Sequence, residues 1–155
     1  MSQIDPFVRL VCEGDKTESN YFIGYLRELG LRQPGIAYKP KDNSPCGIAR
    51  EAKLKYQEAL RLKIPRDKIF VAAVFDHDDH AGVSDAFEML RESPIMVAFS
   101  NICFEFWILL HFERATRPFS NCEEVIGFIH KSHDPNYGKS NDHYTRLREK
   151  IPTAI

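Results

Sequence analysis

Two short apolar segments of this chain each end abruptly at acidic residues. Residues 7–12 are followed directly by Glu13, and residues 69–75 are followed by Asp76 and Asp78. Such runs are typical of buried strands in a parallel sheet, where the carboxyl ends of the strands meet at one edge. Carboxylates brought together there repel each other unless a positive charge lies between them. A divalent metal ion is the simplest source of that charge.

The remaining hydrophobic pattern alternates strands and helices. It predicts strands at 7–12, 36–38, 69–75 and 95–99, and helices at 17–29, 47–62 and about 84–90, the last with Ser84 as its N-cap. After residue 100 the pattern becomes helical, at 103–112, 123–131 and roughly 142–150, with the start of one more helix at 151–155. We therefore expect a single α/β domain over 1–155: a sandwich with a largely parallel central sheet, flanking helices and a helical C-terminal extension. The incomplete last helix suggests a truncated or naturally short chain.

Composition narrows the class of protein. The chain has 155 residues and a formal net charge of −1, so no overall positive field favours nucleic acid, and binding would need a local patch. The four cysteines form no CxxC pair, and we expect reduced thiols buried as small hydrophobic groups. The N-terminus resembles no signal peptide, and no apolar run reaches the roughly 20 residues of a membrane span. These features predict a soluble cytoplasmic protein.

The acidic cluster at residues 76–80 gives the strongest functional signal. In an extended chain the side chains of Asp76 and Asp78 point the same way, so both could bind one Mg²⁺ or Mn²⁺ ion. The alternative is a polar loop after the strand, with Asp79 as a helix cap. His77 and His80 could extend the site towards Mn²⁺ or Zn²⁺, although histidines in a loop are more often plain surface residues.

Two further acids lie near the first strand. Glu13 precedes Gly14, a pair that can also mark an ordinary turn. Glu18 projects into the apolar stripe of the first helix, where a carboxylate needs a partner. It could serve the same site as Glu13, or accept hydrogen bonds from free backbone N–H groups at the helix start.

Glu105 stands within one of the most apolar helices of the chain. An unpaired charge there costs several kcal/mol, so this carboxylate must be paired with a cation, protonated or bound to metal. A structural pair with arginine or lysine and a role in a site are equal alternatives. His111 lies about 120° around the same helix, and we expect a core histidine with satisfied hydrogen bonds.

Other polar residues give weaker signals. Lys139 lies in a loop and could bring a cation to a phosphate, although most loop lysines are simply solvated. His130 and His133 have HxxH spacing but lack acidic or thiol partners at the spacing of a zinc motif, apart from Cys122. We therefore do not expect a zinc site there.

Three motifs together resemble the RloB-like family over nearly the whole chain. They are Glu13-Gly14-x-x-Thr17-Glu18-x-x-Tyr21-Phe22, then Phe75-Asp76-x-Asp78, then Ser100-Asn101-x-Cys103-Phe104-Glu105-x-Trp107-x-Leu109-Leu110-His111-Phe112. Ile102 departs from the proline that is usual in the third motif.

The resemblance implies a Toprim-like fold in which Glu13, Asp76 and Asp78 are ligands of Mg²⁺. It also implies that Glu18 and Glu105 are nearby acids, and that Lys139 is a cation for the transition state. RloB-like proteins occur in bacterial phage-defence and restriction-linked loci, typically beside a gene for an ABC-type ATPase.

The carboxylates and the resemblance predict the same chemistry. We expect a metal-dependent nuclease that acts as a toxin in phage defence and cuts RNA, with tRNA as one candidate, or DNA, when an ATPase partner releases it. The alternative is a catalytically silent module that binds the ATPase or nucleic acid. A haloacid-dehalogenase-like phosphatase is disfavoured because His80 occupies the position where that family has threonine or valine.

Overall fold

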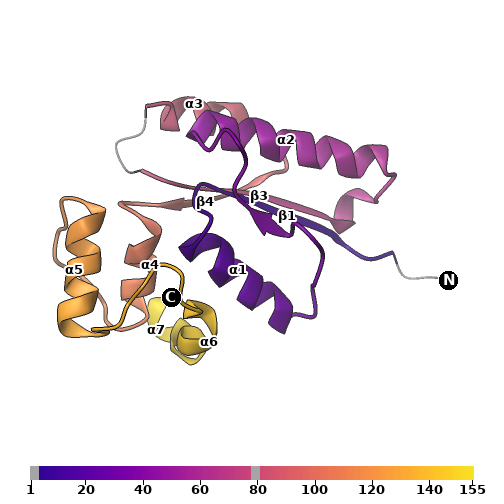
Figure 1. The fold of residues 1–155 in the computed structure, drawn as a ribbon. Coiled ribbons are helices and arrows are strands. Elements are labelled where there is room, and N and C mark those ends of the chain that lie inside the picture. The colour runs from indigo at the N-terminus through magenta and orange to yellow at the C-terminus, as the bar shows by residue number, and fades with distance from the viewer. Residues whose placement is uncertain (1–3, 78–80) are drawn as a thin grey trace.

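A four-stranded parallel sheet forms the centre of the molecule. The computed structural model describes residues 4–77 and 81–155. Its strands are β1 (Phe7–Cys12), β2 (Ala37–Tyr38), β3 (Ile69–Asp76) and β4 (Met96–Ser100), in the order β2-β1-β3-β4 (Figure 1). All three strand pairs are parallel. The expected α/β fold with a parallel central sheet is therefore confirmed, and each strand bound lies within one residue of its expected position.

Helices cover both faces of this sheet. Helices α2 (Pro45–Arg61) and α3 (Val83–Leu90) lie on one face, and α1 (Thr17–Glu28) lies on the other (Figure 1). Strand β3 explains the arrangement, because its odd-numbered residues from Ile69 to Phe75 pack in the α2 and α3 core, whereas Ala72 and Val74 pack in the α1 core. Side chains that alternate between two apolar cores bury both faces of the strand.

The C-terminal part is helical, as expected. It comprises α4 (Phe104–Leu110), α5 (Cys122–Ser132), α6 (His143–Leu147), a 3₁₀ turn (Arg148–Lys150) and α7 (Ile151–Ala154). Tyr21 of α1, Ile108 of α4 and Ile129 of α5 belong to one buried cluster, which fixes these helices on the α1 side of the sheet (Figure 1). Within residues 4–77 and 81–155, no helix is both long enough and apolar enough to cross a bilayer.

One helix start differs from expectation. Helix α3 begins after Gly82, whose φ of 94° places it in the left-handed region, and Ser84 is already the second helical residue. The assignment of Ser84 as N-cap was therefore wrong. A glycine adopts this conformation at little cost, so the turn is made by the backbone and not by a capping side chain.

The expectation of four reduced cysteines was also wrong. Cys103 and Cys122 form a disulfide, whereas Cys12 and Cys46 are free. The bonded pair is 19 residues apart in sequence, so no local spacing signals it. The packing of α4 against α5 brings the beginnings of these two helices together.

Candidate metal centre

Five of the six site residues predicted from the sequence meet in one cavity. Glu13, Glu18, Asp76, Glu105 and Lys139 line a space of about 350 Å³. They come from the ends of β1 and β3, the first turns of α1 and α4, and the loop between α5 and α6. The sixth, Asp78, lies outside the described residues, as do Asp79 and His80.

The register of the sheet places Glu13 beside Asp76. Cys12 pairs with Val74 in the parallel ladder, and the N–H of Glu13 donates to the Val74 carbonyl at 2.9 Å. The Glu13 side chain turns towards β3, where its Oε2 accepts a hydrogen bond from the N–H of Asp76 at 2.8 Å. The carboxyl ends of two neighbouring strands therefore present their acids at the same point.

The surroundings of Asp76 disfavour its negative charge. Burial, followed by the charges of Glu18 and Glu13, raises the pKa of the Asp76 carboxyl to about 8. Loss of hydration and nearby like charges both stabilise the protonated form. A cation bound among these carboxylates would stabilise the ionised form of Asp76 and so oppose the shift. His77, the next residue, is exposed and makes an edge contact with Phe99.

Glu18 belongs to the same electrostatic group. Its side chain is buried in the first turn of α1, and burial raises the pKa of its carboxyl, with a further contribution from the charges of Glu105 and Glu13. The backbone N–H of Glu18 and the charge of Lys139 oppose this rise. The carboxylate packs so closely on Gly14 that a Cβ at Gly14 would collide with it. The glycine therefore leaves the space that Glu18 occupies.

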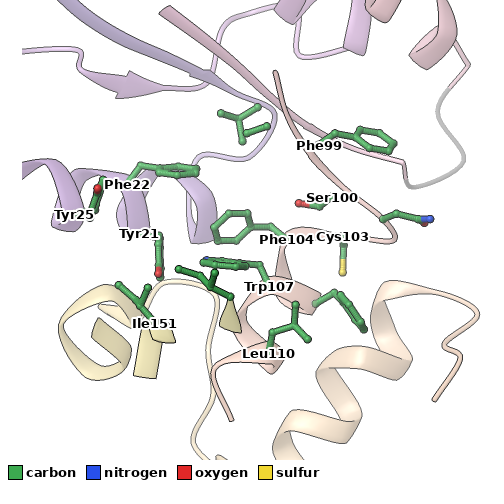
Figure 2. A pocket seen from close by; sticks show the side chains of 15 residues that line it. Tyr21, Phe22, Tyr25, Phe99, Ser100, Cys103, Phe104, Trp107, Leu110 and Ile151 are labelled. Atoms are coloured by element: carbon green, nitrogen blue, oxygen red, sulfur yellow. The ribbon is translucent and has the colours of Figure 1, made fainter. Parts of the chain in front are cut away.

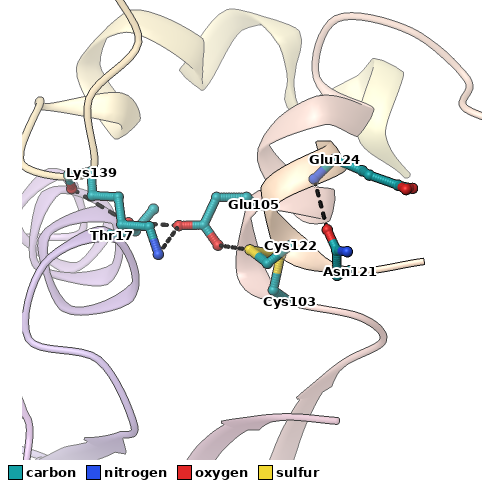
Figure 3. The surroundings of a disulfide bond; sticks show 7 residues. All are labelled: Thr17, Cys103, Glu105, Asn121, Cys122, Glu124 and Lys139. Carbon is teal, nitrogen blue, oxygen red and sulfur yellow. Dashed lines mark hydrogen bonds and ion pairs between the residues drawn. A yellow bond between two sulfur atoms is a disulfide. The ribbon is translucent and has the colours of Figure 1, made fainter. Parts of the chain in front are cut away.

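Glu105 is buried and paired with a lysine. Its Oε1 accepts a hydrogen bond from the Thr17 hydroxyl at 3.1 Å and lies 3.4 Å from Lys139 Nζ (Figure 3). Its Oε2 lies 3.2 Å from the sulfur of Cys122. The ion pair is one of the two alternatives that the sequence left open, and it lies in the wall of the predicted site.

The histidines have other partners. His111 is 1% exposed, its Nε2 is 2.9 Å from the Tyr21 hydroxyl, and its Nδ1 is 2.8 Å from the Trp107 carbonyl. The expectation of a satisfied core histidine is confirmed. His133 is 3.0 Å from the Glu113 carboxylate, and His130 contacts the Pro135 carbonyl.

The cavity-lining residues that sequence reasoning missed include Thr17, Asn43, Cys103 and Cys122. Thr17 and Cys103 stand within the motifs that carry the family resemblance, so motif membership was an available signal for both. Asn43, whose side chain donates to the Glu13 carbonyl at 3.4 Å, and Cys122 stand outside all three motifs. Only the fold brings these two to the site.

A second cavity has different chemistry. It measures about 550 Å³ and is lined by side chains of α1, β4, α4 and α7, including Phe22, Phe99, Trp107 and Ile151 (Figure 2). Among the described residues, no acid, lysine, arginine or histidine lines it. Its lining is mainly apolar, and we assign the candidate site to the acidic cavity.

The acidic cavity fits a hard divalent cation. Six described carboxylates line it, and Mg²⁺ and Mn²⁺ prefer oxygen ligands of this kind. Burial and mutual repulsion raise the pKa of both Glu18 and Asp76, as expected where positive charge is needed. Glu13 and Asp76 are best placed as ligands, because they end adjacent strands and contact each other.

Comparison with known proteins identifies a family. The family model described as RloB-like protein matches residues 8–155, nearly the whole chain. No curated protein and no solved structure matches significantly.

Proposed function

Because the chain belongs to the RloB-like family, we propose that it is a Mg²⁺- or Mn²⁺-dependent nuclease that hydrolyses phosphodiester bonds in RNA, including tRNA, or in DNA. One observation carries the proposal: six carboxylates and two lysines, among them Glu13, Asp76 and Glu105, line a single cavity at the carboxyl edge of the sheet. Ligands of open parallel α/β sheets commonly bind at this edge.

Each residue has a role in this proposal. Glu13, Asp76 and Asp78 hold the ion, which when bound polarises the phosphate and lowers the pKa of a water molecule. Glu18 and Glu105 add negative charge around the ligands. Lys139, whose side chain is 53% exposed, can turn its ammonium group from Glu105 towards a phosphate oxygen that enters the cavity.

The cellular role follows from the resemblance. We propose that the protein is a cytoplasmic toxin of a bacterial phage-defence system and that an ABC-type ATPase, encoded alongside, controls it. The overall charge of −1 agrees with a nuclease that depends on a local site or on a partner for substrate binding.

The test is a cleavage assay with matched variants. The chain, alone and with the ATPase, is incubated with tRNA, single-stranded RNA and plasmid DNA in Mn²⁺ or in EDTA. We expect cleavage only with Mn²⁺, and its loss in the Glu13→Gln/Asp76→Asn double variant. Glu88→Gln is the control, because Glu88 is an exposed acid on α3 that pairs with Arg91 and does not line the cavity. Absence of cleavage with ATPase binding retained would instead favour a silent regulatory module.

A further inference from the structure

Two sulfur atoms and a carboxylate meet in the wall of the acidic cavity. The disulfide joins Cys103, directly before α4, to Cys122, the first residue of α5, and both residues line the cavity (Figure 3). Glu105 lies between them and the rest of the site. One ligand atom from each of Cys103, Glu105 and Cys122 lies within 4.8 Å of the other two.

The two oxygens of Glu105 have different surroundings. Oε1 is near Thr17 and Lys139, whereas the single polar contact of Oε2 within residues 4–77 and 81–155 is the Cys122 sulfur at 3.2 Å. A disulfide sulfur carries no hydrogen, so in the oxidised protein this contact gives Oε2 no donor. Glu105 is only 3% exposed, and a buried carboxylate oxygen without a donor costs free energy. A thiol proton on Cys122, or a metal ion bound to Oε2, would remove this cost.

We propose that, after reduction of the disulfide, Cys103, Cys122 and Glu105 bind one thiophilic divalent ion such as Zn²⁺, and that the disulfide is the closed, metal-free form of this site. Two thiolates and one carboxylate suit zinc, which takes four ligands in a tetrahedron. The cavity can supply water as the fourth ligand. This site differs from the all-oxygen site of Glu13 and Asp76, because thiolate selects zinc over magnesium.

The chemistry balances in electrons, protons and charge. A dithiol reductant gives two electrons and two protons to the S–S bond, which yields two thiols and the oxidised, disulfide form of the reductant. Binding of the ion then releases the two thiol protons to solvent. Two thiolates, a carboxylate and a divalent ion carry a net charge of −1. Lys139, 3.4 Å from the other oxygen of Glu105, neutralises that charge.

The position of Cys122 gives access to the site. Cys103 is 2% exposed, but Cys122 is only half-buried and faces the cavity, so a small thiol can attack its sulfur. Reduction leaves α4 and α5 packed through Ile108, Leu109, Val125 and Ile129, which are buried in one core cluster. The ligands are therefore held near one another after the covalent bond is broken.

The experiment is a Co²⁺ titration of the full chain in excess Mg²⁺, with Co²⁺ as the spectroscopic probe for zinc. Protein reduced with dithiothreitol and then freed of reductant is compared with the oxidised protein. We expect the reduced form to bind one Co²⁺ with thiolate-to-cobalt charge-transfer absorption that Zn²⁺ displaces, and the oxidised form to show none. Cys122→Ser should weaken Co²⁺ binding by about 100-fold or more. Loss of a residue that only supports a ligand lowers metal affinity by about 10–100-fold, and Cys122 is itself a ligand. Cys46→Ser, which changes a free cysteine outside the cavity, should bind normally.

Two results would overturn the proposal: no charge-transfer absorption in the reduced protein, or a Co²⁺ affinity in Cys122→Ser equal to that of the reduced wild type. Alkylation and mass measurement verify which cysteines are free in each sample, and failure of the pair to oxidise would contradict the closed form. If Cys122→Ser does not fold, the comparison of oxidised with reduced wild-type protein decides. None of these measurements uses nuclease activity, so they are independent of the proposed function.

Discussion

At the scale of single residues, Asp76 shows most directly how the surroundings of the site disfavour a negative charge. Partial burial close to Glu18 and Glu13 raises the pKa of the Asp76 carboxyl to about 8 in the folded, metal-free protein. The ordinary pKa of aspartate, about 3.9, applies in the unfolded chain. Between these two pKa values, the Asp76 carboxyl is protonated in the folded state and ionised in the unfolded chain. The free energy of unfolding therefore receives a contribution that is complete below about pH 4 and is lost as the pH rises towards 8.

This linkage predicts the pH dependence of an Asp76→Asn variant. In EDTA, we expect the wild-type free energy of unfolding to fall between pH 5 and 8, and the variant to lack that part of the fall because it has no proton to lose. Urea denaturation at several pH values measures both. Asp85→Asn, at an exposed position of α3, is the control and should follow the wild type. Equal slopes for Asp76→Asn and the wild type would contradict the raised pKa.

Tyr137 offers a second prediction at this scale. Its hydroxyl is buried near the Thr17 side chain but makes no hydrogen bond of good geometry with the described residues, while its ring stacks on His143 with centroids 4.7 Å apart. Phenylalanine keeps the stacking and removes the unsatisfied group, which costs about 1–3 kcal/mol. We expect Tyr137→Phe to raise the free energy of unfolding by about 1 kcal/mol or more. A measured decrease would show that the hydroxyl has a partner in solution.

At the scale of elements, the spacing of hydrophobic residues along the sequence was sufficient to predict the strands. Strands β1 and β3 alternate between two cores and end at acids, so sequence alone placed them within a residue. Other features depend on contacts between distant segments. The segment 142–150 divides into α6 and a 3₁₀ turn, α3 starts at a left-handed Gly82, and a disulfide links α4 to α5. No local pattern reports such contacts.

The turn between β1 and α1 gives the prediction for this scale. Gly14 has no room for a Cβ because the Glu18 carboxylate occupies the space, whereas a Cβ at Gly127, in the exposed face of α5, would meet nothing within 4 Å. We expect Gly14→Ala to displace Glu18 and to weaken Mn²⁺ binding by about tenfold, the lower end for a supporting residue. Gly127→Ala should leave binding unchanged and stabilise α5 by roughly 0.5–1 kcal/mol. Calorimetric Mn²⁺ titration and thermal unfolding test both variants, and unchanged binding in Gly14→Ala would separate Glu18 from the site.

At the scale of the whole molecule, the site joins segments that the sequence keeps far apart. Glu13 and Asp76 were predictable together, because parallel strands end at one edge. Glu105 and Lys139 were predictable as unusual residues but not as partners, since their pairing depends on how the C-terminal helices pack against α1. Thr17, which bonds Glu105 across 88 residues of sequence, needed the fold as well.

A metal ion bound by these segments should therefore stabilise the entire fold. At a concentration 100 times its dissociation constant, an ion that binds only the folded state adds about 2.7 kcal/mol. For a chain of this length that corresponds to a rise of roughly 5–10 °C in Tm. We expect Mg²⁺ or Mn²⁺ to produce such a rise over EDTA in the oxidised protein, where the sulfur site is closed.

The Glu13→Gln/Asp76→Asn variant should differ from the wild type both in its Tm in EDTA and in the response of its Tm to the ion. Above pH 8, where the Asp76 carboxyl is ionised, its Tm in EDTA should be higher than that of the wild type, because the variant has no Asp76 charge close to Glu18. Its Tm should not respond to the ion, because two ligands are lost, while Glu88→Gln should respond like the wild type. If these carboxylates only support the fold, the double variant should instead lose stability, and neither the wild type nor the variant should show a metal-dependent rise in Tm. Differential scanning calorimetry of the three proteins, with and without Mn²⁺, therefore distinguishes a metal centre from a structural network.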